Sequence, residues 1–193
     1  MTTTRSLLIL VALLAGMLAR PPALLADGIE DRAAVCSACH GAAGVPIDAS
    51  IPVIWGQNEG YLYLQLRDFK AGNRSNPIMS AIAAPLERQD MRDLAAFFTA
   101  KQWPALNQPA ASQDVARHAG MVDNSAGCKG CHLANWQGDS TTPRLAGQQS
   151  GYLRATMAAF RDGERANNPW MAALLKTFSD PDLDALAAYL AGL

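Results

Sequence analysis

Hydrophobic residues in both halves of the chain recur at the spacing of an α-helix. Leu62, Leu66 and Phe69 stand at positions i, i+4 and i+7, on one face of a helix. The second half repeats this spacing, and a glycine follows each run as a predicted helix end. No stretch alternates with the period of a β-strand, so we expect an all-α protein. The second run consists of Leu153, Met157 and Phe160. The two glycines are Gly72 after the first run and Gly163 after the second.

A second hydrophobic run near the end of each half predicts a closing helix. Ser179, with Asp182 three positions later, is typical of a helix N-terminus, and Pro181 suits the first turn. The hydrophobic residues assigned to these two helices are Leu86, Leu94, Phe97 and Phe98 in the first half and Leu183, Leu186, Tyr189 and Leu190 in the second.

The second half of the chain repeats the first over most of its length. A repeating unit of about 80 residues is too long for a solenoid, so it predicts two domains of like fold. We place the N-terminal domain at residues 27–103 and the C-terminal domain at 114–193, with a linker at 104–113. The segments that match are Pro52–Gln57 with Pro143–Gln148, Gly60–Leu62 with Gly151–Leu153, Phe69–Gly72 with Phe160–Gly163, Asn76–Met79 with Asn168–Met171, and Leu94–Phe97 with Leu186–Tyr189.

All four cysteines lie in two copies of the pattern C-x-x-C-H. Two thiols one helical turn apart can form thioethers with the two vinyl groups of one haem, and the histidine that follows can ligate its iron. The pattern therefore predicts two haems c. Their attachment residues are Cys36 and Cys39 with His40 as iron ligand, and Cys128 and Cys131 with His132 as iron ligand.

Three other uses of the cysteines compete with haem attachment. A zinc site would combine both pairs, but the distance in sequence between Cys39 and Cys128 far exceeds zinc-ribbon spacing. Two disulfides would not require a histidine after each pair. A thioredoxin-like redox motif expects a βαβ context, which the helical spacing does not provide. Haem attachment is the interpretation that accounts for all six residues.

The internal repeat identifies candidates for the second axial ligand of each iron. Met79 and Met171 are equivalent, each follows an Asn-Pro-x tripeptide, and each follows its histidine at the same interval. We expect the proline to hold each methionine in a loop over the haem. Met91 and Met157 align with leucines instead, so we interpret them as core residues.

Histidine and methionine together fill both axial positions of an iron. The thioether favours ferrous iron and raises the reduction potential, and an iron without a vacant position suits electron transfer better than catalysis. We therefore assign no catalytic residues and no enzyme activity. His118 has no counterpart in the first half and is interpreted as a solvated or capping residue. Pro52 and Pro143 are either turn prolines only, or their carbonyls accept the N–H of the axial histidines from the second shell of ligands.

The N-terminus predicts export from the cytoplasm. Residues 1–26 resemble a secretory signal peptide, with Arg5 before the apolar stretch Ser6–Ala19 and a cleavage site after Ala26. The stretch is shorter than the roughly 20 residues of a membrane-spanning helix, although an uncleaved anchor remains an alternative. The formal net charge is −1, and no run of basic residues points to nucleic acid. We expect a protein that functions outside the cytoplasm and whose partners are redox proteins.

The chain resembles the dihaem cytochromes c4. The resemblance covers essentially the whole mature chain and rests on the two C-x-x-C-H motifs, the P-x-[IL]-x-G-Q segment after each, the methionines after Asn-Pro-x, and the closing L-A-A-[FY] helices. It implies two tandem class I cytochrome c domains, each around one haem with His/Met ligation. It further implies a histidine-binding role for the carbonyls of Pro52 and Pro143. Trp55 departs from the family, which usually has a small residue there.

The resemblance implies a periplasmic electron carrier, often associated peripherally with the membrane, that passes electrons from respiratory-chain donors toward a terminal oxidase. The alternative is the cytochrome subunit of a larger dehydrogenase, such as a flavocytochrome sulfide dehydrogenase. A dihaem peroxidase is disfavoured, because it requires an open iron position.

Overall fold

The fold is all-helical across residues 28–193, the part of the chain that this computed structural model describes. The predicted signal peptide, residues 1–26, lies outside the described residues. No described helix is long and apolar enough to cross a membrane. The helices are α1 (Ile29–His40), α2 (Glu59–Ala71), α3 (Pro77–Ala83), α4 (Arg88–Thr99), α5 (Gln113–Ala126), α6 (Lys129–His132), α7 (Ser150–Asp162), α8 (Pro169–Leu175) and α9 (Asp180–Ala191).

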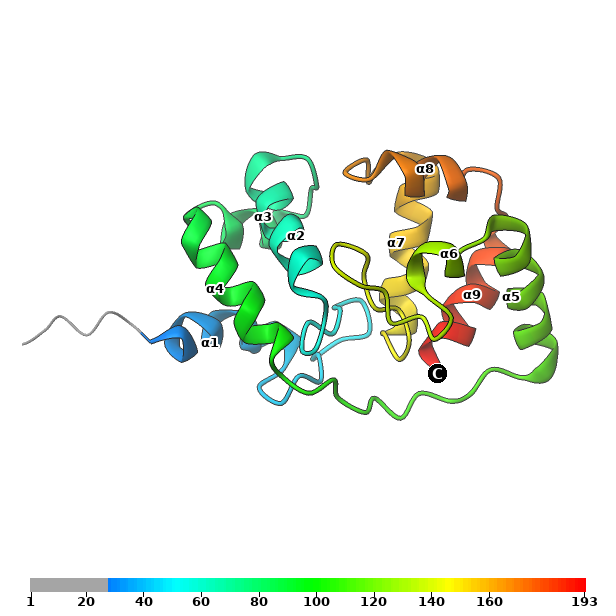
Figure 1. The fold of residues 1–193 in the computed structure, drawn as a ribbon, viewed down its shortest axis with the longest axis horizontal. Helices are drawn as coiled ribbons and strands as arrows, with labels where there is room; N and C mark the ends of the chain where they lie inside the picture. The colour runs from blue at the N-terminus through cyan, green and yellow to red at the C-terminus, as the bar shows by residue number, and fades with distance from the viewer. Residues whose placement is uncertain (1–27) are drawn as a thin grey trace, which may run out of the picture.

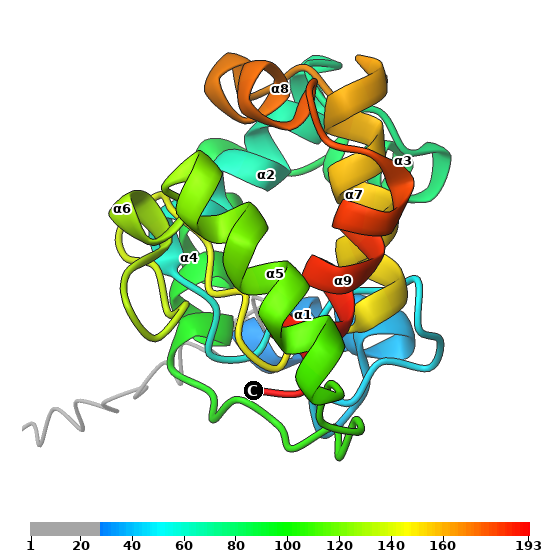
Figure 2. The ribbon, with the colours of Figure 1, turned by 90° about the vertical axis from the view of Figure 1, so that its right-hand side faces the viewer.

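The helices form two groups that share one arrangement. Figure 1 shows α1–α4 on the left and α5–α9 on the right, with an extended segment between α4 and α5. The first and last helices of each group pack together, α1 with α4 and α5 with α9. Figure 2 shows the pair α5 and α9. The helices α2 and α7 pack on the last helix of their group and on the short helix that follows them. The internal repeat of the sequence therefore corresponds to a repeat of structure.

The predicted helix ends agree with the structure. Gly72 and Gly163 end α2 and α7 in the left-handed conformation, with φ of 76° and 81°, which glycine adopts without the steric penalty of a Cβ. The Ser179 side chain and Asp182 form a capping box at the start of α9. Leu86 was assigned to the closing helix of the first half but lies before α4, because Glu87 and Asp90 form an equivalent capping box that starts the helix later.

The two halves have cores of different size. The first half buries a cluster of Ala33, Leu62, Leu94, Ala95 and Phe98. The second half buries a larger cluster that extends over α5, α7 and α9 and includes Met157 and Leu183, which are 9% and 0% exposed. The first half therefore has less apolar burial of its own to stabilise its helices.

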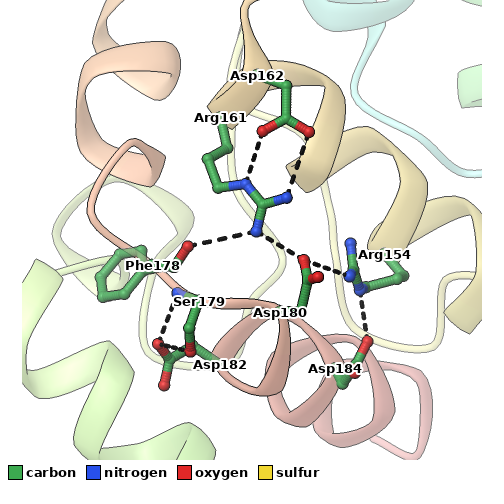
Figure 3. Close-up of polar contacts among 8 residues, drawn as sticks. All are labelled: Arg154, Arg161, Asp162, Phe178, Ser179, Asp180, Asp182 and Asp184. Carbon is green, nitrogen blue, oxygen red and sulfur yellow. Dashed lines mark hydrogen bonds and ion pairs between the residues drawn. The ribbon is translucent and has the colours of Figure 1, made fainter.

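Ion pairs tie α7 to α9 in the second half (Figure 3). Arg154 contacts Asp180 and Asp184, and Arg161 contacts Asp180 at 2.7 Å and Asp162 at 2.8 Å. The aspartates are largely exposed, so water screens these pairs and their contribution to stability is small. They orient α7 against the start of α9.

The halves meet through reciprocal backbone contacts. The Tyr61 amide donates to the Ser140 carbonyl at 3.2 Å, and the equivalent Tyr152 amide donates to the Ala49 carbonyl at 3.0 Å. The tyrosine hydroxyls lie near arginines of the opposite half, since Arg165 is 3.3 Å from the Tyr61 hydroxyl and Arg74 is 3.1 Å from that of Tyr152. The two halves thus present the same surface to each other.

Gly60 allows the two halves to approach closely, and a methyl group there should separate them. A Cβ on Gly60 would lie 2.8 Å from the Ser140 carbonyl oxygen, which is backbone and cannot rotate away. We expect Gly60→Ala to cost about 1–3 kcal/mol in the free energy of unfolding, as overpacking does. Denaturant unfolding of the haem-loaded protein measures this cost.

Gly120→Ala is the matched control, because a Cβ on Gly120 in α5 meets nothing within 4 Å. We expect it to stabilise the protein by about 0.5–1 kcal/mol through helix propensity. Equal midpoints for the two variants would contradict close packing at Gly60.

Candidate functional site: two histidine centres

The first candidate centre is built around His40 at the end of α1. The side chain is buried, at 6% exposure, and its Nδ1 lies 2.8 Å from the carbonyl oxygen of Pro52. A carbonyl can only accept, so Nδ1 carries the proton and Nε2 keeps its lone pair. Burial lowers the pKa of His40, and the hydrogen bond to Pro52 offsets this only in part. The imidazole is therefore neutral at neutral pH and offers Nε2 as a metal ligand.

The second centre repeats this geometry around His132 in α6. His132 is also 6% exposed, and its Nδ1 lies 3.1 Å from the carbonyl oxygen of Pro143. Burial again lowers the pKa of the histidine, against a smaller opposing effect of the hydrogen bond. Pro52 and Pro143 could be turn prolines only, or their carbonyls could accept the N–H of the histidines. The structure contains the hydrogen bonds that the second alternative requires.

The cysteines of each motif lie within one helical turn before the histidine. Cys36 and Cys39 are half-buried on α1, whereas Cys128 and Cys131 follow a break at Gly127, which has φ of 67° and separates α5 from α6. All four thiols are free of disulfides. Both halves therefore present two thiols and one imidazole along a single turn.

The surroundings of Cys128 do not favour thiol redox catalysis. Burial, together with the charge of Asp123, raises the pKa of Cys128 to about 11, and that catalysis uses the thiolate. Within residues 28–193, no three His, Cys, Asp or Glu side chains converge on one point. The described residues therefore contain no single cluster that combines the two cysteine pairs.

Met79 and Met171 lie on short helices rather than in the expected loops. The side chains of Asn76 and Asn168 cap α3 and α8 by accepting from the amides of Met79 and Met171, at 3.0 Å and 3.2 Å. The proline that follows each asparagine occupies the first turn, where its missing N–H costs nothing. The Asn-Pro pair thus starts a helix, and both methionines are half-buried at equivalent positions on it.

The residue before each methionine is apolar and exposed. Ile78 is 67% exposed, and Trp170 is 87% exposed. Packing therefore does not explain Trp170. These two side chains place an apolar contact point on the surface beside each candidate methionine ligand.

Each half has one tryptophan at the loop after its histidine, but the two tryptophans stand at different positions of the repeat. Trp55 packs so closely on Gly44 that a Cβ there would lie 2.7 Å from its ring. In the second half the residue equivalent to Gly44 is Trp136, which is buried and whose carbonyl accepts from the amide of Ala146 at 3.1 Å. Ala146 is the equivalent of Trp55. The unusual Trp55 is thus accommodated by a glycine, and the second half has the reverse arrangement.

His118 has a structural partner outside both centres. Its Nε2 lies 2.7 Å from the Oδ1 of Asp182 and links α5 to the first turn of α9. His118 is thus neither a helix cap nor a solvated side chain without a partner, because it lies inside α5 and holds the Asp182 side chain that takes part in the capping box of α9.

The residues of both centres fit a covalently attached haem. Each half combines two thiols one turn apart, a neutral buried imidazole with Nε2 available, and a half-buried thioether. Thioether bonds need the thiols, and His/Met ligation needs the imidazole and the thioether.

Comparisons with known proteins agree with this geometry. The cytochrome c family model matches residues 121–193. Cytochrome c4 of Azotobacter vinelandii is 32% identical, over 85% of this chain and 87% of its own. The thiosulfate dehydrogenase electron acceptor of Stutzerimonas stutzeri strain A1501 is 35% identical, over 86% and 82%.

The fold gives the same result. The crystal structure of reduced recombinant cytochrome c4 from Pseudomonas stutzeri superposes with a TM-score of 0.77 at 31% identity, over 86% of this chain and 96% of that one. The predicted all-α fold with class I cytochrome c architecture is therefore confirmed, and the chain belongs to the cytochrome c4 family.

Proposed function

We propose that this protein is a dihaem electron carrier that exchanges single electrons with other redox proteins. The observation that carries the proposal is the duplication of one buried geometry, His40 on Pro52 and His132 on Pro143, each following a complete C-x-x-C-H motif. Two such centres in one chain suit successive one-electron steps.

The proposed roles of the residues follow from their chemistry. Cys36 and Cys39 would hold the first haem, with His40 and Met79 as axial ligands. Their equivalents Cys128, Cys131, His132 and Met171 would hold the second haem. When bound, each haem supplies an iron that cycles between the ferric and ferrous states. The protein orients the imidazole through the proline carbonyl and shields its centre with the surrounding helices.

The domain limits and location are part of the same proposal. Residues 27–103 and 114–193 would be the two haem domains, joined by residues 104–113 and exported to the periplasm by residues 1–26. The grouping of α1–α4 and α5–α9 supports the limits.

The electron donor and acceptor are proposed from the relatives. Membership in the cytochrome c4 family favours a respiratory-chain donor and a terminal oxidase as acceptor. The relative named as electron acceptor of thiosulfate dehydrogenase favours a second candidate, the cytochrome partner or subunit of a dehydrogenase. Purification from the native membrane and periplasm separates the two: a carrier elutes as a small haem protein, whereas a subunit co-elutes with a dehydrogenase.

The proposal predicts two haems of unequal potential. The apolar residue before the candidate ligand is Ile78 in one half and Trp170 in the other. In the first half Trp55 packs on Gly44, whereas in the second half the buried tryptophan, Trp136, stands at the position of that glycine. Burial and local dielectric set haem potentials, and oxidation of one haem opposes that of its neighbour by Coulomb repulsion.

A redox titration of the purified protein tests this. We expect a curve that requires two one-electron terms, on a protein whose intact mass includes two covalent haems. A single one-electron curve that stays unchanged when the halves are expressed separately would show that the centres neither differ nor communicate.

A further inference from the structure

Two buried glutamine side chains reach across the boundary between the halves and have no role in the proposed haem binding. Gln57 and Gln148 are 3% and 2% exposed, and they occupy equivalent positions at the end of the P-x-[IL]-x-G-Q segments. A buried amide is costly unless its donor and acceptor are both satisfied. Each glutamine meets this requirement in the opposite half of the molecule.

Gln57 binds the backbone of Arg144 through both ends of its amide. Its Oε1 accepts from the Arg144 N–H at 2.7 Å, and its Nε2 donates to the Arg144 carbonyl at 3.0 Å. The N–H of Asn58 also donates to Oε1, at 2.9 Å, and orients the amide. Reversing the amide would oppose donor to donor and acceptor to acceptor, so the contacts define its orientation.

Gln148 makes the same contacts in the other direction. Its Oε1 accepts from the Val53 N–H at 2.8 Å, and its Nε2 donates to the Val53 carbonyl at 3.0 Å. Gln149 N–H donates to the same Oε1 at 2.9 Å. The two clamps are therefore reciprocal.

Each clamp acts on the peptide group that holds a candidate axial histidine. The carbonyl of Pro143 and the N–H of Arg144 belong to one planar peptide unit. His132 Nδ1 donates to that carbonyl at 3.1 Å, while the N–H of the same unit donates to Gln57. In the first half, the unit between Pro52 and Val53 links His40 to Gln148 in the same way.

Hydrogen bonds in series through one peptide polarise each other. An acceptor on the N–H increases the negative charge on the carbonyl oxygen, which then accepts more strongly from the imidazole. A stronger acceptor on Nδ1 makes the imidazole a more basic ligand and stabilises ferric iron. The glutamine of one half can thereby lower the potential of the haem in the other half.

We propose that Gln57 and Gln148 are positioning residues that act across the boundary, each strengthening the axial histidine of the opposite half. The proposal rests on the proposed ligation of the irons by His40 and His132. Each half would then attain its working potential only while packed against the other.

The test replaces Gln57 with methionine in the full-length, haem-loaded protein. Gln57→Met keeps the length of the side chain and removes both hydrogen bonds to Arg144. We expect an upward shift in the potential of the second haem and a smaller or no shift in that of the first. Gln148→Met should produce the reverse pattern. Redox titrations followed by NMR resolve the haems through the side-chain signals of their axial methionines.

Two further variants keep the test decisive. If Gln57→Met does not fold, Gln57→Asn takes its place, because it shortens the side chain and withdraws the amide without inserting an apolar group. It should also shift the potential of the second haem upward. Asn58→Ala is the matched control, because it keeps the backbone N–H that bonds Gln57 and removes only the side-chain amide. That amide donates across the same boundary, to the carbonyls of Gln137 and Thr142 at 3.1 Å and 2.7 Å, and contacts neither histidine-bearing peptide. The variant should leave the potential of the second haem unchanged.

The outcomes separate this proposal from the ligand assignment. If Gln57→Met shifts the haem of its own half, shifts both equally, or shifts neither, the action across the boundary is wrong. If Asn58→Ala shifted the potential of the second haem as much as Gln57→Met does, the cause would be weaker packing between the halves. That result would overturn the proposal as well. A wrong ligand assignment would be detected by a different experiment. In that case the NMR signals of the axial methionines would persist in Met79→His and Met171→His.

Discussion

Replacing Met171 with histidine is expected to lower the reduction potential of one haem by on the order of 0.2 V, a fraction of the roughly 0.8 V over which axial ligands set haem potentials. Imidazole stabilises ferric iron better than a thioether does. Met79→His should have the same effect on the other haem. The structure places both methionines half-buried at the same position of the equivalent helices α3 and α8. A redox titration of each variant measures the shift.

Met157→His is the control for this prediction. Met157 is 9% exposed within the core of the second half and aligns with Leu66 in the first. Its replacement should destabilise the core by about 2–5 kcal/mol, as loss of a buried apolar side chain does, and leave both potentials nearly unchanged. If Met157 rather than Met171 controlled a potential, the assignment by internal symmetry would be wrong.

Removing one pair of thiols is expected to have unequal effects on the two halves. In Cys36→Ser/Cys39→Ser, the mass should fall by one haem, and the helical signal of α1–α4 should be lost. The main apolar cluster of that half has five buried residues, so we expect its helices to depend on the haem for stability. Cys128→Ser/Cys131→Ser should also lose one haem but keep more of its helices, because the second cluster contains fourteen.

Intact mass and far-ultraviolet circular dichroism measure both effects in a host that matures cytochromes c. Retention of the first half's helices without its haem would show that packing against the second half is sufficient for folding. Two unchanged masses would exclude covalent attachment at the substituted cysteines.

Much of this protein could be predicted from local pattern. The i, i+4, i+7 spacing of Leu62, Leu66 and Phe69 predicts α2 because one helical face must be buried, and Gly72 ends it because the left-handed conformation disfavours a Cβ. Comparing the two halves of the sequence distinguished Met79 and Met171, which align with each other, from Met91 and Met157, which align with leucines. It could do so because equivalent positions in a repeat experience equivalent surroundings.

Other features were misjudged or missed because they depend on competing local effects. The prolines before Met79 and Met171 were expected to prevent a helix, yet with an asparagine cap they begin one. Trp55 was identified as a departure, but its accommodation depends on Gly44, and the matching tryptophan of the other half stands at the position of that glycine.

The sequence by itself determined the helical fold, the duplication and the identity of the candidate haem residues, because thioether and axial ligation require particular residue types at particular spacings. The roles of Gln57 and Gln148 were decided only by the tertiary structure. Their repetition in both halves was visible, but an amide can satisfy its hydrogen bonds within its own half or outside it. Only the packing of the two halves places each glutamine on the peptide that holds the histidine of the other.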